Sequence, residues 1–90
     1  MNFEWDENKS RSNQSKHGID FEAATDLWND KNRVEIQTPY PIENRFILIG
    51  RIDDRLWSAV FTVRENVVRI ISVRRARNKE AELYDQKENS

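Results

Sequence analysis

The densest group of side chains able to do chemistry is a run of arginines near the C-terminus. Residues 69–77 read Arg-Ile-Ile-Ser-Val-Arg-Arg-Ala-Arg, a hydrophobic strand that passes directly into a basic cluster. Each guanidinium presents a planar fork of N–H donors that matches the oxygens of a phosphate group. The run therefore predicts a phosphate site at a rigid strand-to-helix junction. Solvated strand ends and protein-binding surfaces have the same composition, and both alternatives stay open.

Four side chains outside this run are further candidates. His17 is the only histidine, and imidazole exchanges protons near neutral pH; an imidazolium at a helix C-terminus is also favourable for purely structural reasons. Glu80 and Tyr84 are four residues apart on a predicted helix and so share a face. Glu80 could act as a base, and Tyr84 could stack on a nucleobase, donate a proton or close the core. Arg64 is either a phosphate ligand or a solvated charge at the end of a hairpin.

Net charge alone argues against a general nucleic-acid binder, because the chain as a whole carries −1. The distribution is uneven. Residues 1–50 hold six Lys/Arg and nine Asp/Glu, a net charge of −3. Residues 80–90 hold one Lys and four Asp/Glu, which is also a net charge of −3. Residues 51–79 hold eight Lys/Arg and three Asp/Glu, giving +5. The basic charge is thus concentrated in one segment, as in nucleic-acid-binding domains.

The totals predict a single domain over residues 1–90 with a small core. No cysteine is present and there is one histidine, so we expect no metal site. Gly18 and Gly50 stand alone, which excludes a glycine-rich phosphate loop, and we expect no cofactor. No apolar run is long enough to span a membrane, and no signal peptide is recognisable. We therefore expect a cytoplasmic protein.

The pattern of apolar residues predicts an α+β fold made of two N-terminal helices, an antiparallel β meander and a C-terminal helix. Asp6 can cap a helix over Glu7–Lys16 that ends at Gly18, and Asp20 can cap a second helix. A third helix begins at about Asn78. Alternation of apolar and polar residues predicts a brief strand at Phe3–Trp5 and a longer one at Arg33–Thr38. Further strands are predicted at Arg45–Ile52, Arg55–Arg64 and Val67–Arg74. Tight turns are predicted at Asp53-Asp54 and Glu65-Asn66, and a loop at Pro39-Tyr40-Pro41.

Several blocks in this order resemble the BrnT toxins. The matching residues near the N-terminus are Phe3-Glu4-Trp5-Asp6, Lys9, Asn13, Lys16-His17-Gly18-Ile19 and Phe21-Glu22-Ala23-Ala24. The later ones are Arg45, Ile49-Gly50-Arg51, Phe61-Thr62-Val63-Arg64, Arg69-Ile70-Ile71-Ser72-Val73-Arg74-Arg75-Ala76, Glu80 and Tyr84. The match covers residues 3–84. The Lys-His-Gly-Ile and Ile-Ser-x-Arg-Arg-Ala blocks are specific only in combination.

The resemblance implies a toxin of a type II toxin–antitoxin system with a RelE-like α+β fold and a ribonuclease activity that slows translation. It implies a BrnA antitoxin as partner in a hetero-oligomer, with operator DNA bound only through that antitoxin. A ribonuclease without metal directs the 2′-hydroxyl of the RNA at the adjacent phosphate. Cations stabilise the phosphoryl oxygens, and general acid and base groups move the protons.

For this chemistry we expect Arg74 and Arg75 to stabilise the phosphate, with Arg64 less strongly favoured. A straight hairpin places Arg64 and Arg74 at opposite ends. Either the sheet bends sharply, or Arg64 and the Arg74/Arg75 pair serve different subsites. The remaining candidates are His17, Glu80 and Tyr84 for catalysis, and Lys16, Arg51, Arg69 and Arg77 for RNA binding. Trp5, Trp28 and Trp57 are expected in the core. Two alternatives are a non-catalytic subunit that binds an antitoxin and regulates its operon, and a simple nucleic-acid-binding module.

Overall fold

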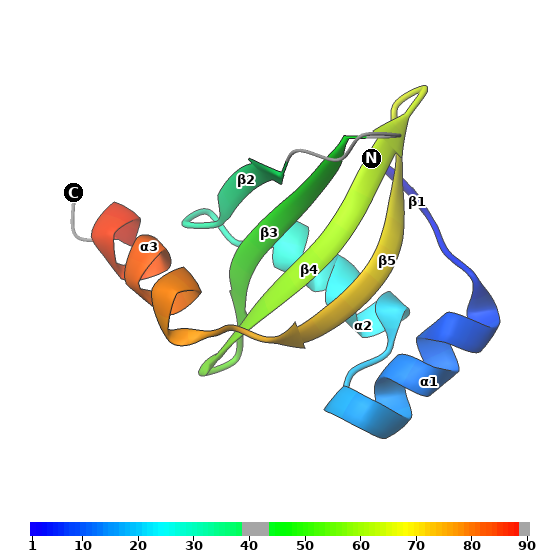
Figure 1. The fold of residues 1–90 in the computed structure, drawn as a ribbon, viewed down its shortest axis with the longest axis horizontal. Helices are drawn as coiled ribbons and strands as arrows, with labels where there is room; N and C mark the ends of the chain where they lie inside the picture. Colours follow the sequence, from blue (N-terminus) through cyan, green and yellow to red (C-terminus); the bar gives the residue numbers. More distant parts are fainter. Residues whose placement is uncertain (39–43, 89–90) are drawn as a thin grey trace.

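A five-stranded mixed sheet forms the centre of the molecule, with strand order β1-β5-β4-β3-β2 (Figure 1). The computed structural model describes residues 1–38 and 44–88. The strands are β1 (Asn2–Glu4), β2 (Val34–Thr38), β3 (Arg45–Ile52), β4 (Arg55–Arg64) and β5 (Val67–Arg75). The helices are α1 (Glu7–His17), α2 (Phe21–Ala24), the 3-10 helix η1 (Thr25–Asn29) and α3 (Asn78–Glu88). No helix in the described ranges is long and apolar enough to cross a bilayer.

The four long strands form in the predicted segments, and β3 and β4 have the predicted bounds. Both tight turns are confirmed. Asp53 has φ 56°, and Glu65 and Asn66 have φ 52° and 66°. In the Glu65-Asn66 turn both central residues thus have positive φ, the geometry that joins two twisted antiparallel strands most directly. The predicted loop at Pro39-Tyr40-Pro41 lies outside the described residues.

The predicted architecture needs two corrections, although the α+β class and the C-terminal helix are confirmed. First, the brief strand predicted at Phe3–Trp5 forms at Asn2–Glu4 and pairs with β5 in parallel, with Asn2 opposite Val67, so the sheet is mixed and not a simple meander. An ion pair of 2.8 Å between Glu4 and Arg69 ties the two strands. Second, the second helix is a single α turn, because the chain tightens into η1 from Thr25 onward.

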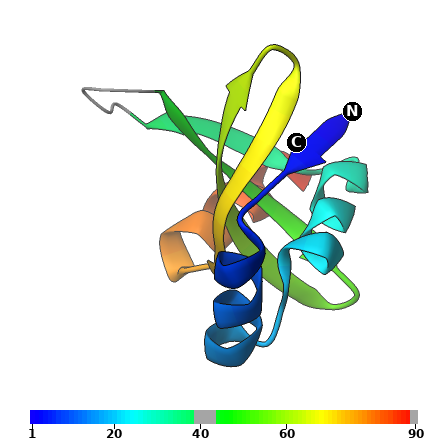
Figure 2. The ribbon, with the colours of Figure 1, turned by 90° about the vertical axis from the view of Figure 1, so that its right-hand side faces the viewer.

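One face of the sheet packs on α2 and η1 to form the hydrophobic core. Figure 2 shows the twisted sheet between these two helices and the start of α3, which lies on the opposite side. Trp28 and Trp57 are buried as predicted, and Trp5 is partly buried against the same cluster. Trp28 lies edge-on to both Phe3 and Phe61, with ring centroids 5.1 Å apart in each pair. This aromatic cluster fixes the sheet that carries the candidate site.

The end of α1 depends on Gly18, which has φ +79° and donates its N–H to the carbonyl of Gln14 at 3.0 Å. The position of a Cβ at Gly18 is open, with no atom within 4 Å, so a substitution would meet only backbone strain. We expect Gly18→Ala to lower the free energy of unfolding by about 1 kcal/mol. Urea unfolding measures this, with Gly18→Asn as the milder comparison. Equal losses in the two variants would contradict the argument from left-handed backbone geometry.

Candidate functional site

The sheet face opposite the core carries most of its arginines. Residues directly across from each other share a face, and Thr62 of β4 lies opposite Arg69 of β5. Arg45 lies across from Thr62 on β3, since Phe46 pairs with Phe61, and Arg64 follows two residues after Thr62. We call the face that carries Arg45, Thr62, Arg64 and Arg69 the basic face. In Figure 1 it faces the viewer, with α3 over its left side and α1 at its right edge.

A cavity of about 690 Å³ lies on the part of the basic face that α3 leaves uncovered. Four cationic side chains line it, from α1, β3, β4 and β5: Lys9, Arg45, Arg64 and Arg69. Two carboxylates, Glu4 and Glu65, also line it. Clustered cations around a concave surface concentrate a polyanionic ligand. We call this the basic cavity.

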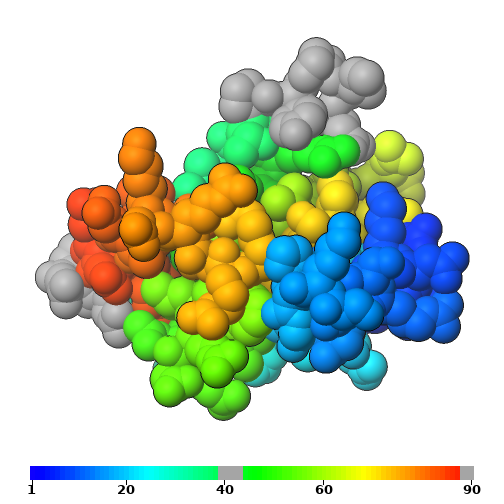
Figure 3. All heavy atoms as spheres, turned by 60° about the horizontal axis from the view of Figure 1, so that its bottom comes forward, coloured from blue at the N-terminus to red at the C-terminus, as the bar shows by residue number. Residues whose placement is uncertain are grey.

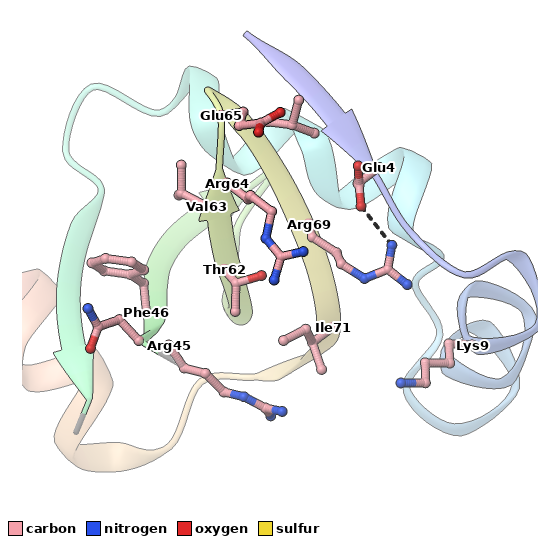
Figure 4. Close-up of a pocket in the computed structure, with 12 residues that line it drawn as sticks. Glu4, Lys9, Arg45, Phe46, Thr62, Val63, Arg64, Glu65, Arg69 and Ile71 are labelled. Carbon is pink, nitrogen blue, oxygen red and sulfur yellow. Dashed lines mark hydrogen bonds and ion pairs between the residues drawn. The ribbon is translucent and has the colours of Figure 1, made fainter. Parts of the chain in front are cut away.

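Arg64 is an arginine of the basic cavity whose side chain has no ion pair within the described part of the chain. It is exposed, and within residues 1–38 and 44–88 it has no ion-pair partner. In Figure 4 its guanidinium points into the cavity, close to Thr62 and Arg69, whereas Arg69 reaches toward Glu4. Arg64 lies opposite Val67 beside the hairpin turn, and Arg74 lies opposite Ser58. The two arginines therefore lie at opposite ends of the hairpin, as the sequence indicated.

Arg74 lies on the basic face but is held by α3. Its Nη1 and Nη2 donate to Oε1 and Oε2 of Glu80 at 2.7 and 2.8 Å. Glu80 also accepts from the Ser58 hydroxyl at 2.9 Å and from the Arg77 N–H at 2.8 Å. The bonds from Arg74 lower the pKa of Glu80 to about 2, although burial opposes this. A carboxylate that accepts four hydrogen bonds is a weak base, which favours a role for Glu80 in fixing Arg74.

This ion pair predicts a loss of stability in acid. Because the folded pKa of Glu80 lies below its ordinary 4.5, the unfolded chain gains a proton first as the pH falls. The ion pair then contributes fully above about pH 5 and is lost toward about pH 2. After solvent screening we expect a contribution of about 1–2 kcal/mol. Urea unfolding measures the difference in the free energy of unfolding between the wild type and Glu80→Gln, which should shrink as the pH falls. A difference that is independent of pH would contradict the prediction.

Arg75 and Arg77 do not join Arg74 at one phosphate. Arg75 follows Arg74 in the strand and points to the other face, where its guanidinium lies 5.5 Å from the ring centre of Trp57. Arg77 is exposed beyond the strand, at the start of α3. The structure therefore separates the three arginines that are nearest to one another in sequence.

Tyr84 is 1% exposed and closes α3 onto the sheet. Its hydroxyl donates to Asp30 Oδ2 at 2.8 Å, and the same oxygen accepts the N–H of Arg51 at 2.8 Å. The Arg51 guanidinium lies 5.4 Å from the ring centre. Burial raises the pKa of Tyr84, and its hydrogen bond to Asp30 raises it further. A buried ring with an engaged hydroxyl fits the core-closing interpretation of Tyr84 better than base stacking.

Lys16 and His17 are exposed at the C-terminal end of α1, and neither lines the basic cavity. Lys16 is seven residues after Lys9, which does line it, so both lie on one side of the helix. In Figure 3 the end of α1 (blue) lies beside the segment that follows β5 (orange), with α3 (red) beyond it. Lys16 and His17 thus lie near the C-terminal end of β5, away from Arg64, which lies beside the turn at its N-terminal end.

Three residues of the site were not predicted from the sequence: Lys9, Arg45 and Ser58. Arg45 had a recognisable signal, because it is a cation at the start of a predicted strand, as Arg64 is at the end of the next one. Lys9 and Ser58 had none, since their roles depend on contacts with β5 and α3. Among the described residues no group of three or more His, Asp or Glu side chains could hold a metal ion.

Comparison with known families now assigns this chain. Residues 5–80 match the family model described as the ribonuclease toxin BrnT of type II toxin–antitoxin systems. The chain belongs to the BrnT family. As a member it is a ribonuclease toxin of a type II system, and an antitoxin protein is its partner. No curated protein matches the chain. The BrnT match extends from Trp5 to Glu80 and so includes every cation that lines the basic cavity.

Proposed function

We propose that this BrnT-family protein is a metal-independent RNA endonuclease that slows translation in the cytoplasm and is neutralised by a BrnA-type antitoxin. The observation that carries the proposal is the basic cavity, which gathers Lys9, Arg45, Arg64 and Arg69 on an uncovered sheet face. Each arginine can donate two parallel hydrogen bonds to the oxygens of one phosphate, which suits binding of an RNA backbone. The type II toxin family supports the ribonuclease class and the antitoxin partner.

In the proposed reaction the RNA supplies its own nucleophile. The 2′-oxygen loses its proton and attacks the adjacent phosphorus, the bond to the 5′-oxygen breaks, and that oxygen takes up a proton. The products are a 2′,3′-cyclic phosphate and a 5′-hydroxyl. The added negative charge on the phosphoryl oxygens is the quantity that fixed guanidiniums stabilise. Arg64 and Arg69 in the basic cavity, and Arg74 further along the same face, are the proposed phosphate ligands, with Lys16, Arg51 and Arg77 as outer RNA contacts.

Proton transfer requires a side chain that can act as an acid or a base beside the RNA. Glu80 and Tyr84 both have hydrogen-bond partners that hold them in place. His17 is exposed and remains the proposed acid–base group, and Arg75, on the other face, is proposed to bind RNA beyond the cleaved bond. General acid and base catalysis contributes about 10²–10⁴-fold. His17→Ala should therefore slow cleavage by a factor within that range.

The direct test is cleavage of a defined RNA by the purified protein. We expect products with 2′,3′-cyclic phosphate and 5′-hydroxyl ends, formed equally well with and without EDTA. Expression of the chain alone should arrest growth, and coexpression with a BrnA-type antitoxin should restore it. Cleavage that stops on adding EDTA would contradict the metal-independent mechanism. Growth arrest without RNA cleavage would contradict the enzymatic one.

One observation favours a second function, that of a non-catalytic subunit which binds the antitoxin and regulates its operon. Arg74, Glu80 and Tyr84, three of the expected catalytic residues, are all tied to other residues of the chain. This alternative predicts that the folded protein binds antitoxin but neither cleaves RNA nor arrests growth. The cleavage experiment therefore separates the two functions directly.

A further inference from the structure

The guanidinium of Arg74 has a specific division between used and unused donors. An arginine side chain has five N–H donors in a rigid plane. Nη1 donates to Glu80 Oε1 at 2.7 Å and to the carbonyl of Arg75 at 3.3 Å, and Nη2 donates to Glu80 Oε2 at 2.8 Å. Three donors are therefore engaged. Two remain, the Nε–H and the second N–H of Nη2, and these lie side by side along the other edge of the plane.

This unused edge is a second fork of the kind that binds two oxygens of one phosphate. Arg74 lies on the basic face in the same row of strand positions as Arg69. Their partners on β4, Ser58 and Thr62, are four residues apart, or roughly 13 Å along the strand. The side chain of Arg74 is 22% exposed, so it is not sealed from solvent by α3. A strand of RNA in the basic cavity could therefore continue to Arg74.

The orientation of this fork depends on Ser58 and Glu80. Ser58 is fully buried in β4 and donates its hydroxyl to Glu80 Oε1 at 2.9 Å. Glu80 is further fixed by the Arg77 N–H, which it caps at the start of α3. Because the carboxylate is held from two sides, it holds the guanidinium of Arg74 in a single orientation. Without it, a long arginine side chain would sample many rotamers.

We propose that Glu80 and Ser58 are positioning residues that present the Nε/Nη2 edge of Arg74 to a phosphate of the RNA. The inference rests on the proposed ribonuclease function and adds a specific subsite to it. Glu80 does not touch substrate. Glu80 neutralises part of the positive charge of Arg74 but fixes the orientation of its guanidinium. A fixed orientation contributes more to stabilising the charge that develops on the phosphoryl oxygens than to initial binding.

If Glu80 fixes the orientation of Arg74, its loss should lower kcat without raising KM. Glu80→Gln removes a negative charge beside the RNA, so KM should stay equal or fall. The amide has one acceptor oxygen and cannot accept both N–H groups of Arg74, so the guanidinium loses its fixed plane. We expect kcat to fall by about 10²-fold, the usual effect of misplacing a catalytic group by about 1 Å. Ser58→Ala should lower kcat in the same direction by about 10-fold, because one of the two supports of Glu80 remains.

The matched control is Glu82→Gln, which makes the same charge change on an exposed residue of the same helix. Its kcat should equal that of the wild type. Arg74→Lys keeps the charge but has no fork, and its kcat should fall as far as that of Glu80→Gln. Circular dichroism and urea unfolding of each variant confirm that the measured rates belong to folded protein.

A second readout does not depend on cleavage. In an NMR titration of the wild type with inorganic phosphate, the Nε–H resonance of Arg74 should shift at lower phosphate concentration than in Glu80→Gln. A wild-type kcat in Glu80→Gln, or equal losses in Glu80→Gln and Glu82→Gln, would overturn the positioning role. If the wild type cleaves no RNA, the proposed function fails, and an Nε–H resonance insensitive to phosphate would then overturn the subsite as well.

Discussion

Arg64→Ala is expected to lower kcat/KM for RNA cleavage by about 10²-fold, the effect of losing roughly 3 kcal/mol of charge-assisted hydrogen bonds to a phosphate of the bound RNA. The structure gives the reason: Arg64 points into the basic cavity and has no ion-pair partner in the described part of the chain. Its whole charge is available to a phosphate. Because the residue is exposed, the free energy of unfolding should change by no more than about 0.5 kcal/mol.

The matched control is Arg55→Ala, since Arg55 is an exposed arginine at the other end of the same strand and does not line the cavity. RNA binding by an uncleavable analogue adds a second measurement. Loss of one phosphate contact should reduce the slope of log affinity against log salt by about 0.7 for Arg64→Ala. Equal effects in the two variants would mean that only overall charge matters and that the basic cavity is not the binding site.

The fold was predictable where local pattern and turn chemistry agree. β2 alternates apolar and polar residues along its length, and Glu65-Asn66 adopts the positive φ values that close the β4–β5 hairpin. The parallel pairing of β1 with β5 was not predictable, because three residues carry little periodic signal and the partner strand is more than 60 residues away. The same holds for the register shift at Val60 and Phe61, which depends on the fit of the assembled sheet.

The candidate site was predictable in composition but not in arrangement. Counting cations located the arginine run of residues 69–77, and strand geometry correctly placed Arg64 and Arg74 at opposite ends of the hairpin. Local density could not reveal that Arg74 and Arg75 point to opposite faces of the sheet. It also could not reveal that Glu80 holds Arg74, because that contact forms only when α3 folds back over β4. Charges that are neighbours in sequence are thus separated, and charges from four elements are gathered in the basic cavity.

Asn13→Ala is expected to destabilise the fold by about 3 kcal/mol, the largest stability effect that we predict. The segment that forms α1 contains no apolar residue, so the helix is held to the sheet by polar contacts. Asn13 is buried and donates through Nδ2 to the carbonyls of Ile19 at 2.9 Å and Val73 at 2.8 Å. It accepts the N–H of Val73 at 3.1 Å. Alanine would leave these buried backbone groups unsatisfied, at about 1–3 kcal/mol each before water enters.

The position of Val73 explains why a side chain takes this role. β1 pairs with β5 only as far as Arg69, so beyond that point the outer edge of β5 has no neighbouring strand. The amide of Asn13 presents one donor and one acceptor, as a strand would, and completes the ladder at Val73. Asn8→Ala is the matched control, because Asn8 is an exposed asparagine on the same helix, and it should cost less than about 0.5 kcal/mol. Urea unfolding compares the two. A small loss in Asn13→Ala, similar to that of Asn8→Ala, would mean that water or a shift of α1 replaces the amide and that this contact does not hold the helix to the sheet.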